Sequence, residues 1–199
     1  MDISQMLWPT VDRKEVAHVL DDVGDQVRIE TINELRRRDL AALFEAAADN
    51  EPLTLDHFVP EDVPPLTQVI HEGKNSLWAF SRFQKRFCRP PSSIASDQLW
   101  GYNEHDFRFF TGPGYFVASQ VGNEVIIDYC RVPAGKPESW PKILSTRERL
   151  SLFVYHGTND LVRRVSRYVA VGRQRKGEQQ KDAWFVLVRK AKTGEPRPT

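Results

Sequence analysis

Apolar residues recur every three to four positions in the first quarter of the chain, which is typical of helices that bury one face. Asp12 can cap a first helix. A longer helix is predicted from about Asp25 to Ala48, with arginines on its other face. Pro52 and Pro60 then interrupt the pattern. We therefore expect N-terminal helices that end near residue 50.

A helical period returns after residue 75. Asn75 or Ser76 can cap the helix, and Pro90-Pro91 ends it. The apolar positions are Leu77, Phe80, Phe83 and Phe87, with arginine and lysine between them. The spacing predicts one basic, amphipathic helix over this segment.

A second helix is predicted further along the chain. Ser145 and Glu148 have the spacing of a capping box. Leu150, Val154, Gly157, Leu161 and Val165 then share one helical face. Because glycine costs about 1 kcal/mol relative to alanine in a helix, the helix is either continuous or interrupted at Gly157.

Between and after these segments the pattern changes to short apolar runs separated by turn residues, which indicates strands. Residues 99–102 form one candidate strand. Gly122-Asn123 predicts a tight hairpin turn between strands at 115–118 and 124–132. A second hairpin pairs residues 168–171 with 184–188 around a polar loop.

The order of elements predicts an α+β fold. Its one antiparallel sheet of four to six strands, made of two hairpins, packs against the long helix, and the N-terminal helices add a further layer. We expect residues 1–199 to form a single domain. It comprises an acidic helical part (1–72), a basic α+β part (73–192) and a frayed tail (193–199).

The composition is that of an ordinary globular protein, with 40% hydrophobic and 28% charged residues. No stretch reaches the roughly 20 apolar residues of a membrane-spanning helix, and the N-terminus lacks the pattern of a signal peptide. We therefore expect a cytoplasmic protein that does not contact membranes. In that compartment Cys88 and Cys130 should be reduced, and their apolar neighbours predict that both are mostly buried.

The net charge of +1 hides an uneven distribution. Residues 1–72 hold 16 acidic and 6 basic residues, whereas residues 73–199 hold 11 acidic and 22 basic residues. The two halves could neutralise each other within one fold or across a homo-oligomer, which the sequence leaves open. The basic half could instead bind an acidic partner or nucleic acid. No nucleic-acid motif occurs and the pI is only about 7.8, so nucleic acid is the disfavoured partner.

Three short motifs resemble an uncharacterised family of bacterial cytosolic proteins. They are Trp100-Gly101-Tyr102-Asn103, Thr111 to Val117 (TGPGYFV) and Arg163 to Ser166 (RRVS). The resemblance covers about residues 73–190. It implies a bacterial, cytosolic protein and no particular activity, cofactor or site residue.

The common cofactor and hydrolase motifs are missing. The chain has no phosphate-binding loop, no dinucleotide-binding glycine motif, no nucleophile elbow and no zinc-ligand pairs. We therefore expect neither a cofactor nor a metal.

Two places could nevertheless carry acid–base chemistry. His105 and Asp106 lie in an aromatic loop, although the side chains of adjacent residues diverge. His156 and Asp160 are four residues apart, so they would meet on one face of a continuous helix. Either pair could equally be an ordinary loop or surface feature.

Our leading hypothesis is a non-catalytic protein that binds a small organic molecule, which could be anionic, in an aromatic-lined pocket between sheet and helix. The predicted lining residues are Trp100, Tyr102, Tyr115 and Tyr129, with Arg86 and Arg164 at its mouth. One alternative is an enzyme with a histidine general base and an aspartate partner. The other is an interaction protein that uses the basic half.

Overall fold

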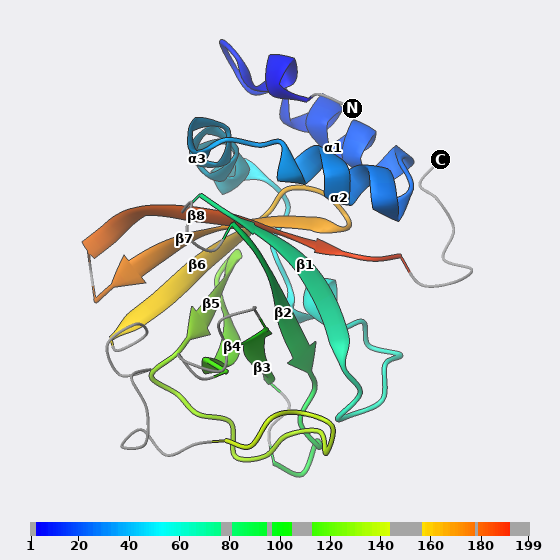
Figure 1. The fold of residues 1–199 in the computed structure, drawn as a ribbon, viewed down its shortest axis with the longest axis vertical. Helices are drawn as coiled ribbons and strands as arrows, with labels where there is room; N and C mark the ends of the chain where they lie inside the picture. The colour runs from blue at the N-terminus through cyan, green and yellow to red at the C-terminus, as the bar shows by residue number, and fades with distance from the viewer. Residues whose placement is uncertain are drawn as a thin grey trace.

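The protein is built around a closed β-barrel. In the computed structural model, which describes residues 3–76, 81–94, 97–104, 113–143, 157–177 and 179–191, eight antiparallel strands follow one another in sequence order and the last pairs with the first (Figure 1). The strands are β1 Val69–Asn75, β2 Arg82–Cys88, β3 Gln98–Glu104, β4 Tyr115–Val121, β5 Glu124–Asp128, β6 Thr158–Arg164, β7 Val169–Lys176 and β8 Gln179–Arg189. The interior of an eight-stranded barrel is filled by side chains or holds one small ligand. The inward-facing residues therefore decide what this barrel can do.

Three helices cover one side of the outer wall. They are α1 Arg13–Asp22, α2 Asp25–Asn33 and α3 Arg37–Ala46, and short 3-10 turns lie at Ser4–Leu7 and Ala47–Asp49. Figure 1 shows these helices in blue at the top, lying across β8 and the strands beside it. They bury outward-facing residues such as Leu161, Val171 and Val186. The helices therefore convert the outer face of β6, β7 and β8 into a second apolar core.

A short helix closes one end of the barrel. This helix is α4 (Leu55–Phe58). Its last residue, Phe58, and the next residue, Val59, are fully buried among inward-facing residues of the strands. The Phe58 ring lies 4.8 Å from the ring of Phe87 on β2. The amide of Leu53 donates a hydrogen bond to the carbonyl of Asn123 in the β4–β5 turn, which marks the closed end. At the opposite end β3 and β5 finish and β6 begins.

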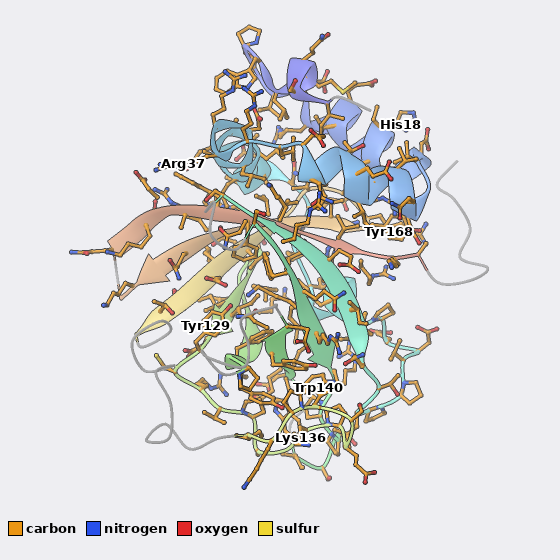
Figure 2. All side chains as sticks on the ribbon, viewed as in Figure 1. His18, Arg37, Tyr129, Lys136, Trp140 and Tyr168 are labelled. Carbon is orange, nitrogen blue, oxygen red and sulfur yellow. The ribbon has the colours of Figure 1, made fainter. Side chains whose placement is uncertain are left out.

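A third apolar cluster lies on the outer wall over β2, β3 and β4. Trp140 packs its ring against Tyr102, with 5.0 Å between the ring centroids, and against Tyr115. Its indole nitrogen donates a hydrogen bond of 2.8 Å to Gln68. In Figure 2 Trp140 lies on the far side of the barrel from the helices. Trp140 therefore shields the outer face of β3 and β4 from solvent, as the helices do for β6 to β8.

The predicted fold class is wrong. The structure is a closed barrel of eight strands with short helices, not a sheet of four to six strands packed against a long helix. The helix expected over residues 25–48 is divided into α2 and α3. The backbone amide of Arg36 donates to the buried carboxylate of Asp39 at 2.8 Å, which starts a new helix at this point.

The prediction of a basic helix after Asn75 is also wrong over the described part, since residues 82–88 form strand β2, whereas residues 77–80 lie outside the described residues. Phe83 and Phe87 fit a helical spacing, but they also fit a strand in which every second residue faces the same way. Lys85 lies between them on the inner face and is buried. A buried lysine is rare, so its presence concealed the alternation of the strand.

The second long helix is wrong over the part that the structure describes. Residues 158–164 form strand β6, whereas residues 144–156 lie outside the described residues. Leu161 and Val165 are both buried beneath the helices, and Val162 faces the barrel interior. Because both sides of β6 are covered, it does not show the clear alternation of a half-exposed strand.

Both predicted hairpins are present. Val121 pairs with Glu124 across Gly122, whose φ of 60° is the left-handed backbone that such a tight turn requires. In the second hairpin β7 and β8 extend further than expected, so that Lys176 pairs with Gln179 and the expected polar loop is mostly strand.

Acidic N-terminal residues contact basic strand residues. Arg164 lies 3.0 Å from Glu51, and Arg173 lies 3.5 Å from Glu45. The carboxylate of Asp21 accepts hydrogen bonds from the backbone amide of Arg167. These contacts are what an intramolecular pairing of the two halves requires. Exposed ion pairs contribute little stability, so burial of the helices holds the two parts together.

The two cysteines differ in environment. Cys88 is buried, and burial raises the pKa of its thiol to about 12. Cys130 is exposed, so the prediction that both thiols are buried is wrong for this residue. They are not bonded to each other. Among the described residues no helix has the length and apolar character needed to cross a membrane.

Candidate functional site

Four polar side chains meet inside the barrel, and they come from opposite parts of its wall. They are Lys85 of β2, Asn103 of β3, Tyr129 just after β5, and Asp160 of β6. Lys85, Asn103 and Asp160 are at most 6% exposed. Tyr129 is labelled in Figure 2. We call this set the Lys85 cluster.

The pleat of the strands explains why these residues share the interior. Lys85 alternates with Phe83 and Phe87, and the latter belongs to the inner core. Asp160 alternates in the same way with Val162. Asn103, Tyr129 and Asp160 lie within three residues of strand ends at the barrel end opposite α4. The cluster therefore lies towards that end of the interior.

The ammonium nitrogen of Lys85 has three hydrogen-bond acceptors. It donates to Asn103 Oδ1 at 3.0 Å, to Asp160 Oδ2 at 3.3 Å and to the hydroxyl of Tyr129. The Tyr129 hydroxyl donates in turn to Asp160 Oδ2 at 2.9 Å and accepts from Asn103 Nδ2 at 3.2 Å. Each member of the cluster thus contacts at least two others, which fixes the positions of all four side chains.

Aromatic rings surround the Lys85 nitrogen. It lies 5.0 Å from the ring centroids of Tyr129 and Phe185, 5.2 Å from that of Phe116 and 5.5 Å from that of Phe83. Distances below about 6 Å allow a cation to interact with the negative face of a ring. The rings therefore form an apolar wall that tolerates a positive charge at its centre.

Glycines hold three of these rings close to the barrel wall. Gly73, Gly101 and Gly172 are the direct cross-strand partners of Phe83, Phe116 and Phe185, respectively. A Cβ atom at these glycines would lie only 2.1 to 2.6 Å from the nearest ring carbon. The rings can lie flat on the backbone only because the paired residue has no side chain, and this leaves the middle of the barrel to Lys85.

We expect Gly172→Ala to destabilise the protein by about 1–3 kcal/mol, because the new methyl group pushes the Phe185 ring towards Lys85. Urea unfolding measures the change. Gly24→Ala is the matched control, since nothing lies within 4 Å of the added carbon there. Equal stability of the two variants would contradict the close packing of ring on glycine.

Burial shifts both ionisable groups of the cluster towards their neutral forms. It lowers the pKa of Lys85 and raises the pKa of Asp160, while the attraction between the two groups opposes both shifts. Moving a proton from Lys85 to Asp160 therefore costs less here than it does in water. The Tyr129 hydroxyl bridges the two groups and provides a path for that proton.

A barrel that needed only a core would not require this arrangement. Buried ion pairs are generally no more stabilising than apolar residues of the same volume, because both charges lose their hydration. Buried titratable groups with shifted pKa values are enriched at functional sites. The Lys85 cluster is therefore the candidate site of this protein.

No family model and no curated protein matches the chain.

The four aromatic residues predicted to line one pocket lie on two different surfaces. Trp100, Tyr102 and Tyr115 belong to the cluster on the outer wall, whereas Tyr129 points into the barrel. The described part of the helix that was to cover them is strand β6 instead. The Tyr115 hydroxyl donates to the carbonyl of Pro141. Only Tyr129 of this set is therefore placed at the candidate site.

The two predicted arginines also lie outside the barrel. The Arg86 guanidinium lies 5.7 Å from the ring centroid of Tyr102 and 3.8 Å from Glu104. Arg164 contacts Glu51, as described above. The structure does not bring either side chain to the Lys85 cluster.

Of the acid–base candidates, His105, Asp106 and His156 lie outside the described residues. Asp160 is described, and it lies on strand β6 with Lys85 and Tyr129 as its partners. The sequence predicts Asp160 as a partner of His156 on one helix. In the structure Asp160 belongs to the candidate site through its contacts with Lys85 and Tyr129.

Sequence reasoning missed Lys85 and Asn103. The signal that could have revealed Lys85 is the alternation Phe83, Lys85, Phe87, in which lysine occupies an inward position. Glycine within the strand pattern, as at Gly101, is a sign of close approach by another group.

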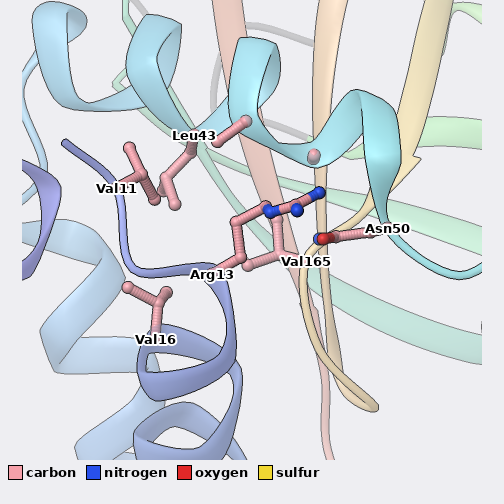
Figure 3. A pocket seen from close by; sticks show the side chains of 8 residues that line it. Val11, Arg13, Val16, Leu43, Asn50 and Val165 are labelled. Atoms are coloured by element: carbon pink, nitrogen blue, oxygen red, sulfur yellow. The ribbon is translucent and has the colours of Figure 1, made fainter.

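A separate recess lies between α1, α3 and the end of β6, and it is shown in Figure 3. Its volume of about 10 Å³ is room for about one water molecule. It is lined by Val11, Arg13, Val16, Leu43, Ala46, Ala47, Asn50 and Val165. This recess is too small for an organic ligand. Within the described ranges no three His, Cys, Asp or Glu side chains are grouped so that they could hold a metal ion.

Proposed function

We propose that the protein binds a small organic molecule inside the barrel, with a carboxylate or carbonyl oxygen of that molecule at Lys85. The observation that carries the proposal is the Lys85 cluster itself, a buried lysine with three polar partners inside a ring of aromatic side chains.

The polar part of the cluster favours a ligand that accepts hydrogen bonds. Lys85 provides a positive charge, and Asn103 and Tyr129 provide further donors. An incoming oxygen would replace one of the two uncharged acceptors of Lys85, Asn103 Oδ1 or the Tyr129 hydroxyl, because the Asp160 carboxylate balances the charge of the ammonium group. Ligand pockets in proteins commonly combine a few such groups with apolar walls.

The rings around the cluster favour an apolar or aromatic ligand body. Phe83, Phe116 and Phe185 offer ring faces and no hydrogen-bonding groups. A benzene ring with one acidic or carbonyl substituent combines the two required properties. Benzoate is therefore a suitable first probe.

The proposal is tested by saturation-transfer NMR and calorimetry with benzoate and the full chain. We expect binding by the wild type and loss of binding in the double variant Lys85→Met/Asp160→Leu, which replaces the ion pair by apolar residues of similar size. Lys190→Met is the matched control, because Lys190 is exposed and lies 3.7 Å from Glu72 on the outside of the barrel.

Binding that survives in the folded double variant would place the ligand elsewhere and reject the proposal. The same holds if benzoate, benzaldehyde and benzyl alcohol all fail to bind to the wild type. Competition between benzoate and benzyl alcohol shows how much of the affinity comes from the charge.

A further inference from the structure

We infer that Lys85 is a nucleophile that captures an aldehyde or ketone as an imine. This inference rests on the proposed function, since it names the chemical class of the ligand bound at the same site. The geometry that points to it is an amine held against a hydroxyl and a carboxyl group, with apolar rings on the remaining sides.

The residue at position 85 is a lysine and not an arginine, which favours a nucleophile over a purely structural ion pair. Arginine is the residue best suited to a buried ion pair with a carboxylate, because its planar guanidinium makes two parallel hydrogen bonds and stays charged. Lysine can lose its proton and become a nucleophile when apolar surroundings remove its hydration. Lys85 has such surroundings, with its side chain 3% exposed.

The neighbours of Lys85 supply the proton transfers that imine formation needs. Lys85 first passes one proton to Asp160 through the Tyr129 hydroxyl, which leaves a neutral amine beside a protonated carboxyl group. The amine attacks the carbonyl carbon and forms the C–N bond, while the Tyr129 hydroxyl gives its proton to the oxygen and takes one from the new nitrogen. Asp160 then returns its proton to that oxygen, the C–O bond breaks, and the nitrogen lone pair forms the C=N bond. One molecule of water and a protonated imine result, and no oxidant or reductant is required.

The walls of the site stabilise the product. A protonated imine keeps the positive charge at the position of the Lys85 nitrogen, where the rings of Phe116, Tyr129 and Phe185 lie about 5 Å away. Asp160 remains within hydrogen-bond distance as the counter-ion. Exclusion of water by the same rings slows hydrolysis of the imine.

The experiment is reductive trapping. The full chain is incubated at neutral pH with benzaldehyde and sodium cyanoborohydride, which adds hydride to an imine and leaves a benzyl group on the amine. We expect one benzyl group per chain, located on Lys85 by peptide mapping. Lys190→Met should be labelled like the wild type, and the double variant Lys85→Met/Asp160→Leu should not be labelled.

Tyr129→Phe tests the role of the hydroxyl as a proton donor. We expect the trapping rate to fall about 100-fold, the size of a typical general acid–base contribution. The pH profile of the rate should change as well, which the loss of a purely structural contact would not produce. An unchanged rate and profile would remove Tyr129 from the reaction.

The two proposals can fail separately. If benzoate and benzyl alcohol bind but Lys85 is not labelled, or if benzyl groups appear only on exposed lysines, the imine is rejected and the binding function remains. If none of the three benzene derivatives binds and no label is found, both are rejected.

Discussion

Replacing Lys85 by methionine is expected to destabilise the protein by about 3–5 kcal/mol, because it leaves the Asp160 carboxylate buried without its cation. Asp160 can then avoid a buried charge only by taking up a proton. Urea unfolding at neutral pH, followed by circular dichroism, measures the change in the free energy of unfolding.

The double variant Lys85→Met/Asp160→Leu is the informative partner of this experiment. With both charges removed, neither group has to be desolvated, so we expect stability equal to the wild type or up to about 4 kcal/mol higher. Recovery of stability together with loss of benzoate binding would show that the ion pair is kept for its chemistry rather than for folding.

The outside of the barrel provides the control. Lys190→Met should change the stability by no more than about 0.5 kcal/mol, because Lys190 is exposed. If Lys85→Met is as harmless as Lys190→Met, the Lys85 cluster is not the dry, paired arrangement described above. The candidate site would then lose its physical basis.

The register of the first hairpin could have been worked out from the sequence alone. A two-residue turn at Gly122-Asn123 pairs Val121 with Glu124, and counting back pairs Val117 with Asp128. Paired residues lie on the same face of the sheet, so Val117 and Tyr115 share a face with Asp128 and not with Tyr129. The prediction of one pocket lined by Tyr115 and Tyr129 treated the two strands separately and therefore placed these two residues together.

Other parts of the fold could not be predicted by periodicity. Helices cover the outer face of β6, and Trp140 covers that of β3, so both sides of these strands carry apolar residues. Such strands resemble buried helix segments when only the spacing of apolar positions is considered. Closure of the barrel depends on the pairing of β1 with β8, which are more than 100 residues apart and carry no local signal of their contact.

The candidate site was partly predictable for a related reason. Asp160 and Tyr129 were noticed because they are chemically distinctive, but their partners come from strands that are far apart in the sequence. Lys85 and Asp160 are 75 positions apart. Only the closed barrel brings β2 and β6 to face each other across its interior.

The closed end of the barrel should make the protein sensitive to acid. His57 of α4 and His71 of β1 are buried, and their ring centroids lie 5.3 Å and 5.4 Å from that of Phe58. The His71 ring donates a hydrogen bond from Nε2 to the Phe58 carbonyl at 3.0 Å. Among the described residues neither His57 Nε2 nor His71 Nδ1 has a hydrogen-bond partner. Because the His71 ring donates from Nε2, its Nδ1 carries no proton in the neutral form that burial favours.

Several positive groups oppose protonation of this pair. Arg189 of β8 donates a hydrogen bond to the carbonyl of His57 at 3.1 Å. Burial, together with repulsion from Arg189, lowers the pKa of His71 to about 3. Burial and repulsion from His71, Arg164 and Arg189 lower the pKa of His57 as well.

We therefore expect the free energy of unfolding to decrease as the pH falls below about 6.5, where histidines of the unfolded chain begin to bind protons. The decrease continues towards pH 3, where His71 is protonated in the folded state too. A histidine that binds a proton only in the unfolded chain costs about 1.4 kcal/mol per pH unit, so His71 alone accounts for about 5 kcal/mol over the whole range.

Urea unfolding at pH 7 and pH 5 should therefore show a loss of about 2 kcal/mol from His71 in the wild type, to which His57 adds, and the part due to His71 should disappear in His71→Met. His18→Gln changes an exposed histidine of α1 and should leave the pH dependence as it is. If His71→Met has the same pH dependence as the wild type, the buried histidines are not the acid-sensitive element. The expected result would place acid-sensitive groups at the end of the barrel that α4 closes, because both histidines adjoin Phe58 there.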